Sequence, residues 1–485
     1  MEQTNTVQLL GSGTSFKAPT FWETSVILLK FGVPLMITGF TAYLLYFLNA
    51  YVVALRQDAT LLGSMGIGDT LYQVIAEGMA YGFSLAFYVQ FVPLIAQKQY
   101  SQGCRLFYRR VAAAFFASIP IIVLYLFSHQ IFTFAGVLPE LSQGAYEFLM
   151  SLIPASYLVF VSYTFLNFLS AYDHQNIYVS IGIVTGIIEL LLVYVAMITF
   201  KGDLYWIGIL VGWYLATRIV VSVFYCKYVL VKEFPGSWVW PSWDMFTGIG
   251  EEVKYGWDNA FVSLPITMLI EINIVISGGL TDVEAAVQAL IFRLYAPIVY
   301  LIDDLSFAVV SKVLFYKGEG EGNLVKVYLE NGLKLLILAC GFLALFWYGL
   351  GETLLSWLVP AGDEFKGPMS SALKYVGIAN FLNGLVMHFA KLLRSHDKAF
   401  LCAGTLTIGS LLIHIPFGYL LCFNFGLRLE GIWIAFILAL LFDLATMIYF
   451  ASKIDHSKML VVANTETNQD VEMTTVKKLS TDKSY

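Results

Sequence analysis

The chain has 485 residues and a formal net charge of −6; 58% of its residues are hydrophobic and 13% are charged. Soluble domains carry about 25% charged residues, so this composition, with a mean hydropathy of +0.74, excludes an ordinary soluble domain and predicts an all-α, polytopic membrane protein. No basic tract of the kind that binds nucleic acid occurs, and we expect a small-molecule substrate and the lipid bilayer as partners, with no nucleic acid.

Cysteine usage and the N-terminus narrow the class further. The five cysteines are scattered and form no CxxC pair, at Cys104, Cys226, Cys340, Cys402 and Cys422. Neither a metal site nor a disulfide framework is indicated, and we expect no cofactor. The first twenty residues lack a charged start followed by an apolar run, so we expect no cleaved signal peptide.

Twelve apolar windows are long enough to cross a bilayer as helices. In chain order they lie near residues 25–53, 65–95, 108–134, 145–171, 177–200, 204–231, 250–279, 283–313, 327–349, 371–393, 400–423 and 430–452. They predict two lobes of six helices each, at residues 25–231 and 250–452, joined by a linker at 232–249. An N-terminal segment (1–24) precedes the lobes, and a polar, disordered tail (453–485) follows them.

Loop charges predict the orientation. If both termini are cytoplasmic, the inner loops hold fifteen Lys and Arg residues, and the outer loops hold only Arg56, Lys201, Lys366 and Arg428. The positive-inside rule therefore predicts cytoplasmic termini in a multi-pass protein of the plasma or vacuolar membrane.

The two predicted lobes echo each other. NFLSAYDHQNIYVSIGIVTGIIELLLVYVAM in the first corresponds to AKLLRSHDKAFLCAGTLTIGSLLIHIPFGYLL in the second, with Asp173 and Asp397 about 224 residues apart. A parallel repeat of two six-helix lobes is typical of transporters whose substrate site lies between the lobes.

Several stretches resemble the multidrug and toxic compound extrusion (MATE) transporters. The best is SGGLTDVEAAVQALIFRLYAPIVYLIDDLSFAVVSKV, followed by GEGEGN; AKLLRSHDKAF and YVQFVPLIAQKQYSQG, which contains Gln97, are similar to further family patterns. The resemblance covers nearly all of the twelve-helix region. It implies efflux of organic cations or other amphiphiles, coupled to inward movement of H⁺ or Na⁺.

The chain departs from the family at several acidic positions. Asn49 and Asn383 stand where members carry acidic residues in the first and tenth helices, and Val92 replaces an aspartate of the second helix. Of two glutamates that members often carry in the seventh helix, only the second is matched, by Glu271, while Ile266 occupies the first position.

Glu271 is the leading candidate for ion coupling. Steps of four residues join it to Asn259, Ser263 and Thr267 in one polar stripe on an otherwise apolar helix, which Pro265 interrupts. A charged residue at this depth costs roughly 2.5–3.5 kcal/mol on insertion scales. Burial favours the neutral carboxyl, so exchange of a proton near neutral pH is expected. The alternative is a structural carboxyl hydrogen-bonded to a neighbouring helix.

The eighth helix adds two acidic candidates. Arg293, Tyr300 and Asp304 share one face, and Asp303 is one position round. Arg293 and Asp304 are about 16 Å apart along the axis, too far to pair directly. Either these aspartates belong to the coupling path, or they form interhelical ion pairs that hold their lobe together.

Further candidates are spread over other helices. Asn383 and His388 lie on one side of the tenth helix, where His388 is either a proton relay or a simple hydrogen-bonding group. Lys391, on the same helix, is expected to extend to the cytoplasmic surface. In the first lobe Glu77 and Glu189 are lower-ranked candidates, and Arg218 is a potential partner of either.

The sequence as a whole favours a secondary-active antiporter. No Walker A loop, HExxH or GxSxG motif occurs, so neither ATP-driven pumping nor hydrolysis is indicated and we expect no enzyme. We expect a monomer. Two alternatives stay open: a lipid-linked oligosaccharide flippase, which would use the basic residues Arg218, Arg293, Lys334 and Lys374, and a non-transporting receptor or scaffold.

Overall fold

The structure is a computed structural model that describes residues 18–56, 58–134, 137, 139–277, 279–358 and 366–454. Every regular element in these ranges is a helix or a helical turn, as the composition predicts. The predicted tail from residue 455 onward and most of the predicted N-terminal segment lie outside the described residues, as do the side chains of Thr267, Glu271 and Arg293.

The helices fall into two halves along the chain. The first half contains α1 (Phe21–Ala54), α2 (Ala59–Leu71), the π-helical turn η1 (Tyr72–Glu77), α3 (Gly78–Ala96), α4 (Tyr100–Leu126), α5 (Ser128–Phe134), α6 (Pro139–Ser151), α7 (Ile153–Ala171), α8 (Gln175–Tyr194), η2 (Val195–Thr199), α9 (Leu204–Tyr225), η3 (Cys226–Leu230) and α10 (Val231–Glu233). After the short turn η4 (Trp243–Phe246), the second half contains α11 (Ile249–Ser277), α12 (Asp282–Glu319), α13 (Gly322–Leu358), α14 (Lys366–Arg394), α15 (Ala399–Ile408), η6 (Gly409–His414), α16 (Ile415–Tyr419), η7 (Leu420–Asn424) and α17 (Arg428–Ser452).

Ten helical stretches in the described part of the chain are long and apolar enough to cross a bilayer. They match ten of the twelve predicted spans. The other two, near 250–279 and 283–313, coincide with α11 and α12. The chain is a multi-pass membrane protein.

Two predicted spans are broken where the sequence predicts continuous helices. The span predicted at 108–134 ends at Leu126 and resumes as α5, and the one predicted at 145–171 is divided between α6 and α7 at Leu152. Pro154 explains the second break, because proline has no amide hydrogen and fits the first turn of a helix better than its interior. The hydropathy windows did not register that interruption.

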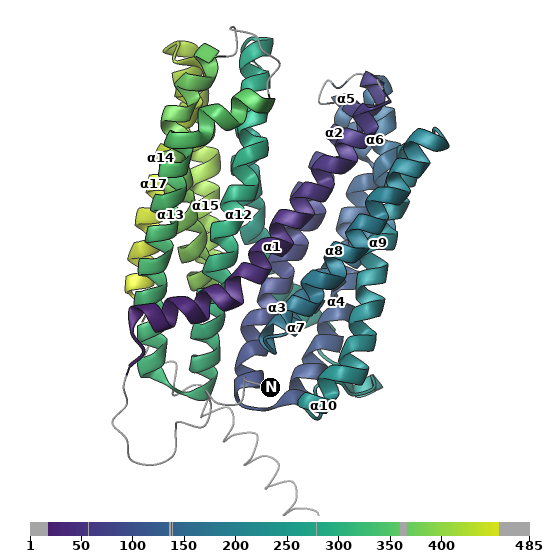
Figure 1. The fold of residues 1–485 in the computed structure, drawn as a ribbon, viewed down its shortest axis with the longest axis vertical. Coiled ribbons are helices and arrows are strands. Elements are labelled where there is room, and N and C mark those ends of the chain that lie inside the picture. Colours follow the sequence, from purple (N-terminus) through teal and green to yellow (C-terminus); the bar gives the residue numbers. More distant parts are fainter. Residues whose placement is uncertain are drawn as a thin grey trace, which may run out of the picture.

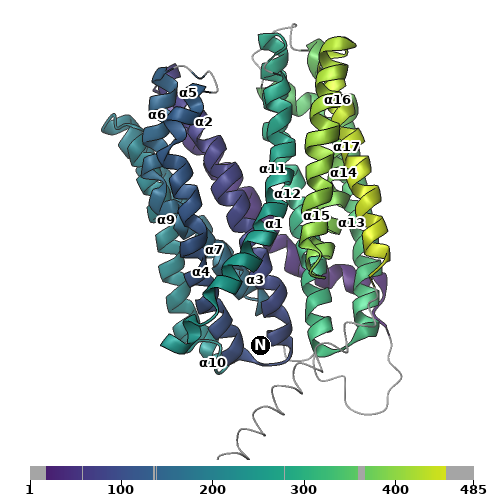
Figure 2. The same cartoon turned by 180° about the vertical axis from the view of Figure 1, so that it is seen from behind.

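Figures 1 and 2 show two bundles that lie side by side and diverge toward one end. The helices α2–α9 form one bundle and α12–α17 the other, while α1 and α11 run obliquely between them. The helix α1 packs on α12 and α13 as well as on α8, and α11 packs on α3 and α4 as well as on α15. Each half therefore lends its first helix to the other, which ties the bundles together.

The same backbone turns recur in both halves. Asp173 and Asp397, 224 residues apart, both have left-handed backbone (φ 60° and 57°). In each case the next amide bonds the carbonyl four residues before the aspartate, at 2.9 and 3.0 Å. The π turns η2 and η7 also match, since they begin at Val195 and Leu420 and each has five residues. These matches recur at nearly the spacing that the sequence predicts.

One glycine controls how closely α3 approaches α11. A methyl group at Gly82 would lie 2.6 Å from the Asn259 carbonyl oxygen and 2.8 Å from the Ala260 Cα. Because both are main-chain atoms, the helices would have to separate. Gly82→Ala is expected to lower the free energy of unfolding by about 1–3 kcal/mol, measured as a lower melting temperature in detergent.

Gly66→Ala in α2 is the matched control, because no atom lies within 4 Å of the added methyl group. Alanine favours an exposed helix position over glycine by about 1 kcal/mol, so this variant should be at least as stable as the parent. Equal melting temperatures for the Gly82 and Gly66 variants would contradict the close packing of α3 on α11.

Candidate functional site

The two halves meet along α3 and α12, which pair at equivalent positions. The Tyr81 hydroxyl donates to Asp303 Oδ2 at 2.7 Å, and the Gln97 side chain donates to the Gly318 carbonyl at 3.2 Å. Between these bonds, the hydroxyl of Tyr88 contacts that of Ser311. The partners are 222, 221 and 223 residues apart, so the two helices run parallel and in register over about 24 Å.

The interface is closely packed at the end where Gln97 bonds Gly318. A methyl group at Gly318 would lie 2.6 Å from the Pro93 Cα and 2.9 Å from the Ala96 Cβ. Glycine is therefore required for the α12 backbone to lie against α3. Gln97, one of the candidates predicted from the sequence, donates its hydrogen bond to the carbonyl of Gly318. It therefore lies at the interface and joins the two halves.

The two repeated aspartates also make contacts across the molecule. Lys312 Nζ of α12 lies 3.1 Å from Asp173 Oδ1, and the Tyr255 hydroxyl of α11 donates to Asp397 Oδ1 at 2.8 Å. Asp173 is thus linked to the second half, and Asp397 to the part of α11 that packs on the first half. The repeated turns form a second set of links at the end where the halves meet.

At the opposite end of this interface from Gln97, Asp303 pairs with Lys391. The side chains are 4% and 3% exposed, and Lys391 Nζ bonds the Asp303 carboxylate and also its carbonyl, the latter at 3.1 Å. The same ammonium lies 5.6 Å from the ring centroid of Tyr81. The prediction that Lys391 extends to the surface is wrong, because its charge is neutralised inside the protein. Asp303 therefore has partners in both halves, one ionic and one hydrogen-bonded.

Other predicted residues lie around this pair. Ser263 accepts a 3.4 Å hydrogen bond from Arg394 Nη2, and His388 Nδ1 lies 3.0 Å from the Ser306 hydroxyl. Oδ2 of Asp304 is buried and has no hydrogen-bond partner among the described residues. The aspartates of α12 therefore differ: Asp303 is fully engaged, and Asp304 has an unused oxygen.

The predicted stripe on α11 is only partly described. Asn259 and Ser263 are buried, and both approach Gly82 of α3. The side-chain amide of Asn259 donates to the Tyr255 carbonyl at 3.1 Å. The first two residues of the stripe thus face the other half rather than lipid; the side chains of Thr267 and Glu271 lie outside the described residues. Asn383 lies deeper in the second half and donates to the Tyr295 hydroxyl at 3.1 Å.

The first half holds its own buried polar groups. Asn49 Nδ2 donates to Glu189 Oε1 at 3.0 Å, and the Tyr46 hydroxyl donates to Glu77. The sequence did not predict either pairing. Among the described residues Arg218 pairs with neither glutamate; it donates to the Tyr214 hydroxyl at 2.7 Å.

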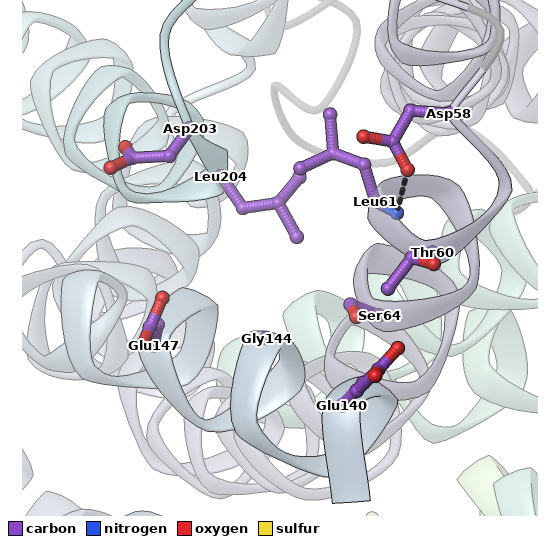
Figure 3. A pocket seen from close by; sticks show the side chains of 9 residues that line it. All are labelled: Asp58, Thr60, Leu61, Ser64, Glu140, Gly144, Glu147, Asp203 and Leu204. Atoms are coloured by element: carbon purple, nitrogen blue, oxygen red, sulfur yellow. Dashed lines mark hydrogen bonds between the residues drawn. The ribbon is translucent and has the colours of Figure 1, made fainter. Parts of the chain in front are cut away.

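A small surface cavity at the far end of the first half, about 140 Å³, is lined by acidic side chains including Asp58, Glu140, Glu147 and Asp203 (Figure 3). It lies away from the paired helices, and its Asp58 caps α2 by accepting from the Leu61 amide at 3.0 Å. Within the described ranges, no group of three or more His, Cys, Asp or Glu side chains is placed to hold a metal ion. The polar network between α3, α12 and α14 is therefore the candidate site.

Solved MATE transporters have a similar fold. The eukaryotic MATE transporter AtDTX14 superposes with a TM-score of 0.84 at 17% sequence identity, over 92% of this chain and 99% of that one. A mutant of the Vibrio cholerae MATE transporter VcmN gives 0.78 at 13% identity, over 90% and 99%. An outward-facing multidrug resistance MATE transporter of the MOP superfamily gives 0.76 at 13% identity, over 91% and 96%. By sequence, no family model and no curated protein matches the chain.

These similarities confirm the predicted resemblance at the level of the fold. Coverage of nine-tenths or more of both chains means that the whole helical region shares the MATE architecture. The proteins that share it are transporters rather than enzymes, in agreement with the prediction from the sequence.

The buried ion pair yields a stability prediction. Removing one member of such a pair leaves the other charge uncompensated and costs about 3–5 kcal/mol, whereas replacing both restores much of that loss. We expect Asp303→Asn and Lys391→Met each to destabilise strongly, and the double variant to be more stable than Asp303→Asn alone. Unfolding in detergent, followed by tryptophan fluorescence, measures the four corners of this cycle.

The exposed pair Lys374–Glu430 is the control. Its charges are 3.8 Å apart and the Lys374 side chain is 64% exposed, so Lys374→Met should change stability by only about 0–1 kcal/mol. Strictly additive effects of the Asp303 and Lys391 replacements would show that the two charges are not coupled.

Proposed function

We propose that the protein is a secondary-active antiporter that exports organic cations or other amphiphiles in exchange for H⁺ or Na⁺ by alternating access. Asp303 carries the proposal, because its carboxylate binds Lys391 in its own half and Tyr81 in the other. A carboxylate that loses a partner when the halves part has a different affinity for a proton or cation in each conformation. Exchange requires such a dependence.

The fold supports this proposal, since a solved protein that shares it is a multidrug resistance transporter. In our proposal α2, η1 and α3 make one crossing, and the chain crosses the membrane twelve times in two pseudo-symmetric six-helix lobes, 25–231 and 250–452. The linker 232–249 and both termini are cytoplasmic, and the protein acts as a monomer.

The proposed orientation in the membrane indicates which side of the protein is open in the described conformation. With cytoplasmic termini, the end at which Asp173 and Asp397 make their links faces the cytoplasm. The halves are then joined on the cytoplasmic side and diverge toward the outside (Figure 1). Opening inward requires the bonds from Tyr81, Gln97 and Lys312 to break.

Glu271 shares the coupling role in this proposal. It lies on α11, a helix that packs against both halves. It also belongs to the predicted polar stripe whose first two members are Asn259 and Ser263. Protonation of Glu271 would remove the counter-charge of a bound cation. Substrate and proton would then compete for one carboxylate, which is the minimum requirement for exchange.

The flippase alternative has lost part of its support. Of the four basic residues that would make a basic cavity, Lys334 and Lys374 are exposed, and the Arg293 side chain lies outside the described residues. Of the three whose side chains are described, Arg218 alone is buried. A receptor or scaffold would not need conformation-dependent partners for a buried carboxylate.

Reconstitution in proteoliposomes tests the proposed exchange. We expect uptake of a fluorescent organic cation when a pH gradient or a Na⁺ gradient is imposed, and no accumulation without a gradient. The two gradients are imposed separately, so the experiment also identifies the coupling ion. Failure of both to drive uptake, in vesicles that bind the dye, would contradict antiport.

Two neutral replacements test the carboxylates. Glu271→Gln and Asp303→Asn fix the uncharged form, and each should lower gradient-driven uptake at least about tenfold. Uptake is measured per amount of folded protein, because Asp303→Asn also loses stability. Glu271→Asp should keep part of the activity with a shifted pH profile. Lys374→Met serves as the control and should transport at the parent rate. Parent-like transport by Glu271→Gln across a pH series would make that carboxyl structural.

Cysteine labelling tests the orientation. Phe134 at the end of α5 and Trp243 in the linker are 96% and 93% exposed, whereas all five native cysteines are buried. The helices α5 and α10, at the second of which the linker begins, lie at opposite ends of the molecule (Figure 1). In intact cells an impermeant thiol reagent should label Phe134→Cys but label Trp243→Cys only after permeabilisation. The reverse pattern would invert the proposed topology.

A further inference from the structure

Arg218 is a buried cation in the interior of the first half. It lies on α9, is 7% exposed, and donates one hydrogen bond, from Nη1 to the Tyr214 hydroxyl at 2.7 Å. Its guanidinium carbon lies 4.2 Å from the ring centroid of Tyr178 and 5.1 Å from that of Tyr214. Aromatic rings therefore provide most of its surroundings.

No carboxylate neutralises this charge among the described residues. Two glutamates of the first half have other partners: the partly buried Glu77 accepts from Tyr46, and the buried Glu189 accepts from Asn49. Nε of Arg218 is buried and has no hydrogen-bond partner within the described ranges. Because arginine cannot be deprotonated in proteins, the charge is permanent and its compensation is incomplete.

The depth of Arg218 makes the missing counter-charge more significant. Fourteen residues separate it from Leu204 at the start of α9, or about 21 Å along the helix, which places it near the middle of the crossing. Intramembrane charges at such depths mark substrate or ion pathways more often than packing sites. Lipid offers the guanidinium no partner there.

A glycine of α8 leaves space for the Arg218 guanidinium. A methyl group at Gly182 of α8 would lie 2.9 Å from Nη2 and 3.1 Å from Cζ. Glycine thus lets the guanidinium lie directly against α8. Tyr178 beside the guanidinium is buried, whereas Tyr163 and Tyr214 are only partly buried.

Aromatic side chains also lead from the interface between the halves into the first half. Tyr163 packs edge-on against Tyr81, with ring centroids 5.9 Å apart, and Tyr81 bonds Asp303. Tyrosines therefore lie both beside the Asp303–Lys391 pair and beside Arg218. Such side chains suit a flat aromatic molecule, since rings stack on rings without demanding a fixed hydrogen-bond pattern.

We propose that Arg218 is an anion subsite, which binds the carboxylate or another small oxyanion of an aromatic amphiphile carried by this protein. The guanidinium fork matches the geometry of such a group, and Nε has no other partner within the described part of the chain. The tyrosines would hold the aromatic part of the same molecule. The proposal rests on the transport function proposed above and adds that the preferred substrate bears a negative group.

A matched pair of dyes tests the subsite. A rhodamine with a free carboxylate and its methyl ester differ only in the group that Arg218 would bind. Fluorescence polarisation with the purified full-length protein in detergent measures both affinities without any ion gradient. We expect the parent to bind the free acid at least about tenfold more tightly than the ester, the scale of one charge-assisted contact.

Substitution of Arg218 should remove that preference. Arg218→Met is expected to weaken binding of the free acid at least about tenfold and to leave binding of the ester within about twofold. Arg218→Lys keeps the charge without the fork and should retain part of the preference. Lys374→Met, which removes an exposed cation from the other half, should bind both dyes like the parent.

Gly182→Ala keeps the proposal testable if Arg218→Met does not fold. It displaces the guanidinium without changing any charge, and should reduce the preference for the free acid while ester binding persists. Equal affinity of the parent for the two dyes, or equal weakening of both dyes in the folded variants, would overturn the subsite. Gradient-driven uptake of the ester tests the antiport proposal independently, so either idea can fail without the other.

Discussion

The buried charge of Asp303 has its partners within the protein, and these partners organise the interface between the halves. Lipid supplies no hydrogen bond and no counter-charge. Lys391 neutralises the carboxylate from α14, and Tyr81 reaches it from α3. The register of α3 against α12 follows from that contact and from the bond between Gln97 and the backbone at Gly318. A shift of one residue along either helix would break both.

The internal repeat explains why these contacts come in matched positions. Halves that carry the same backbone turns at a nearly constant spacing place equivalent helices face to face at one position between them. Helices α3 and α12 occupy that position, and the links made by Asp173 and Asp397 lie at the same end of the molecule. Apolar packing accompanies the polar bonds between the halves, since Tyr88 of α3 lies against Phe307 of α12 with ring centroids 4.5 Å apart.

The two halves have the same backbone geometry at their repeated turns but differ in their buried charges. The second half contains the ion pair of Asp303 and Lys391, whereas the first contains Glu189 bound to Asn49 and Arg218 among tyrosines. The Asn49 amide shows what an acidic residue at that position would change. It donates to Glu189, and an ionised carboxylate there could only repel it. The repeat therefore preserves the geometry of the turns and not the chemistry of the interior.

The sequence by itself determined the membrane class, the positions of most spans and the resemblance to MATE transporters, because hydropathy and turn motifs are local properties of the chain. Only the tertiary structure decided that Lys391 turns inward to Asp303, that Tyr81 reaches the same carboxylate, and that Arg218 lies apart from Glu77 and Glu189. A helix that is apolar nearly all round carries little record of its rotation about its own axis. The partner of a buried polar group is therefore fixed by how helices from distant parts of the chain pack together.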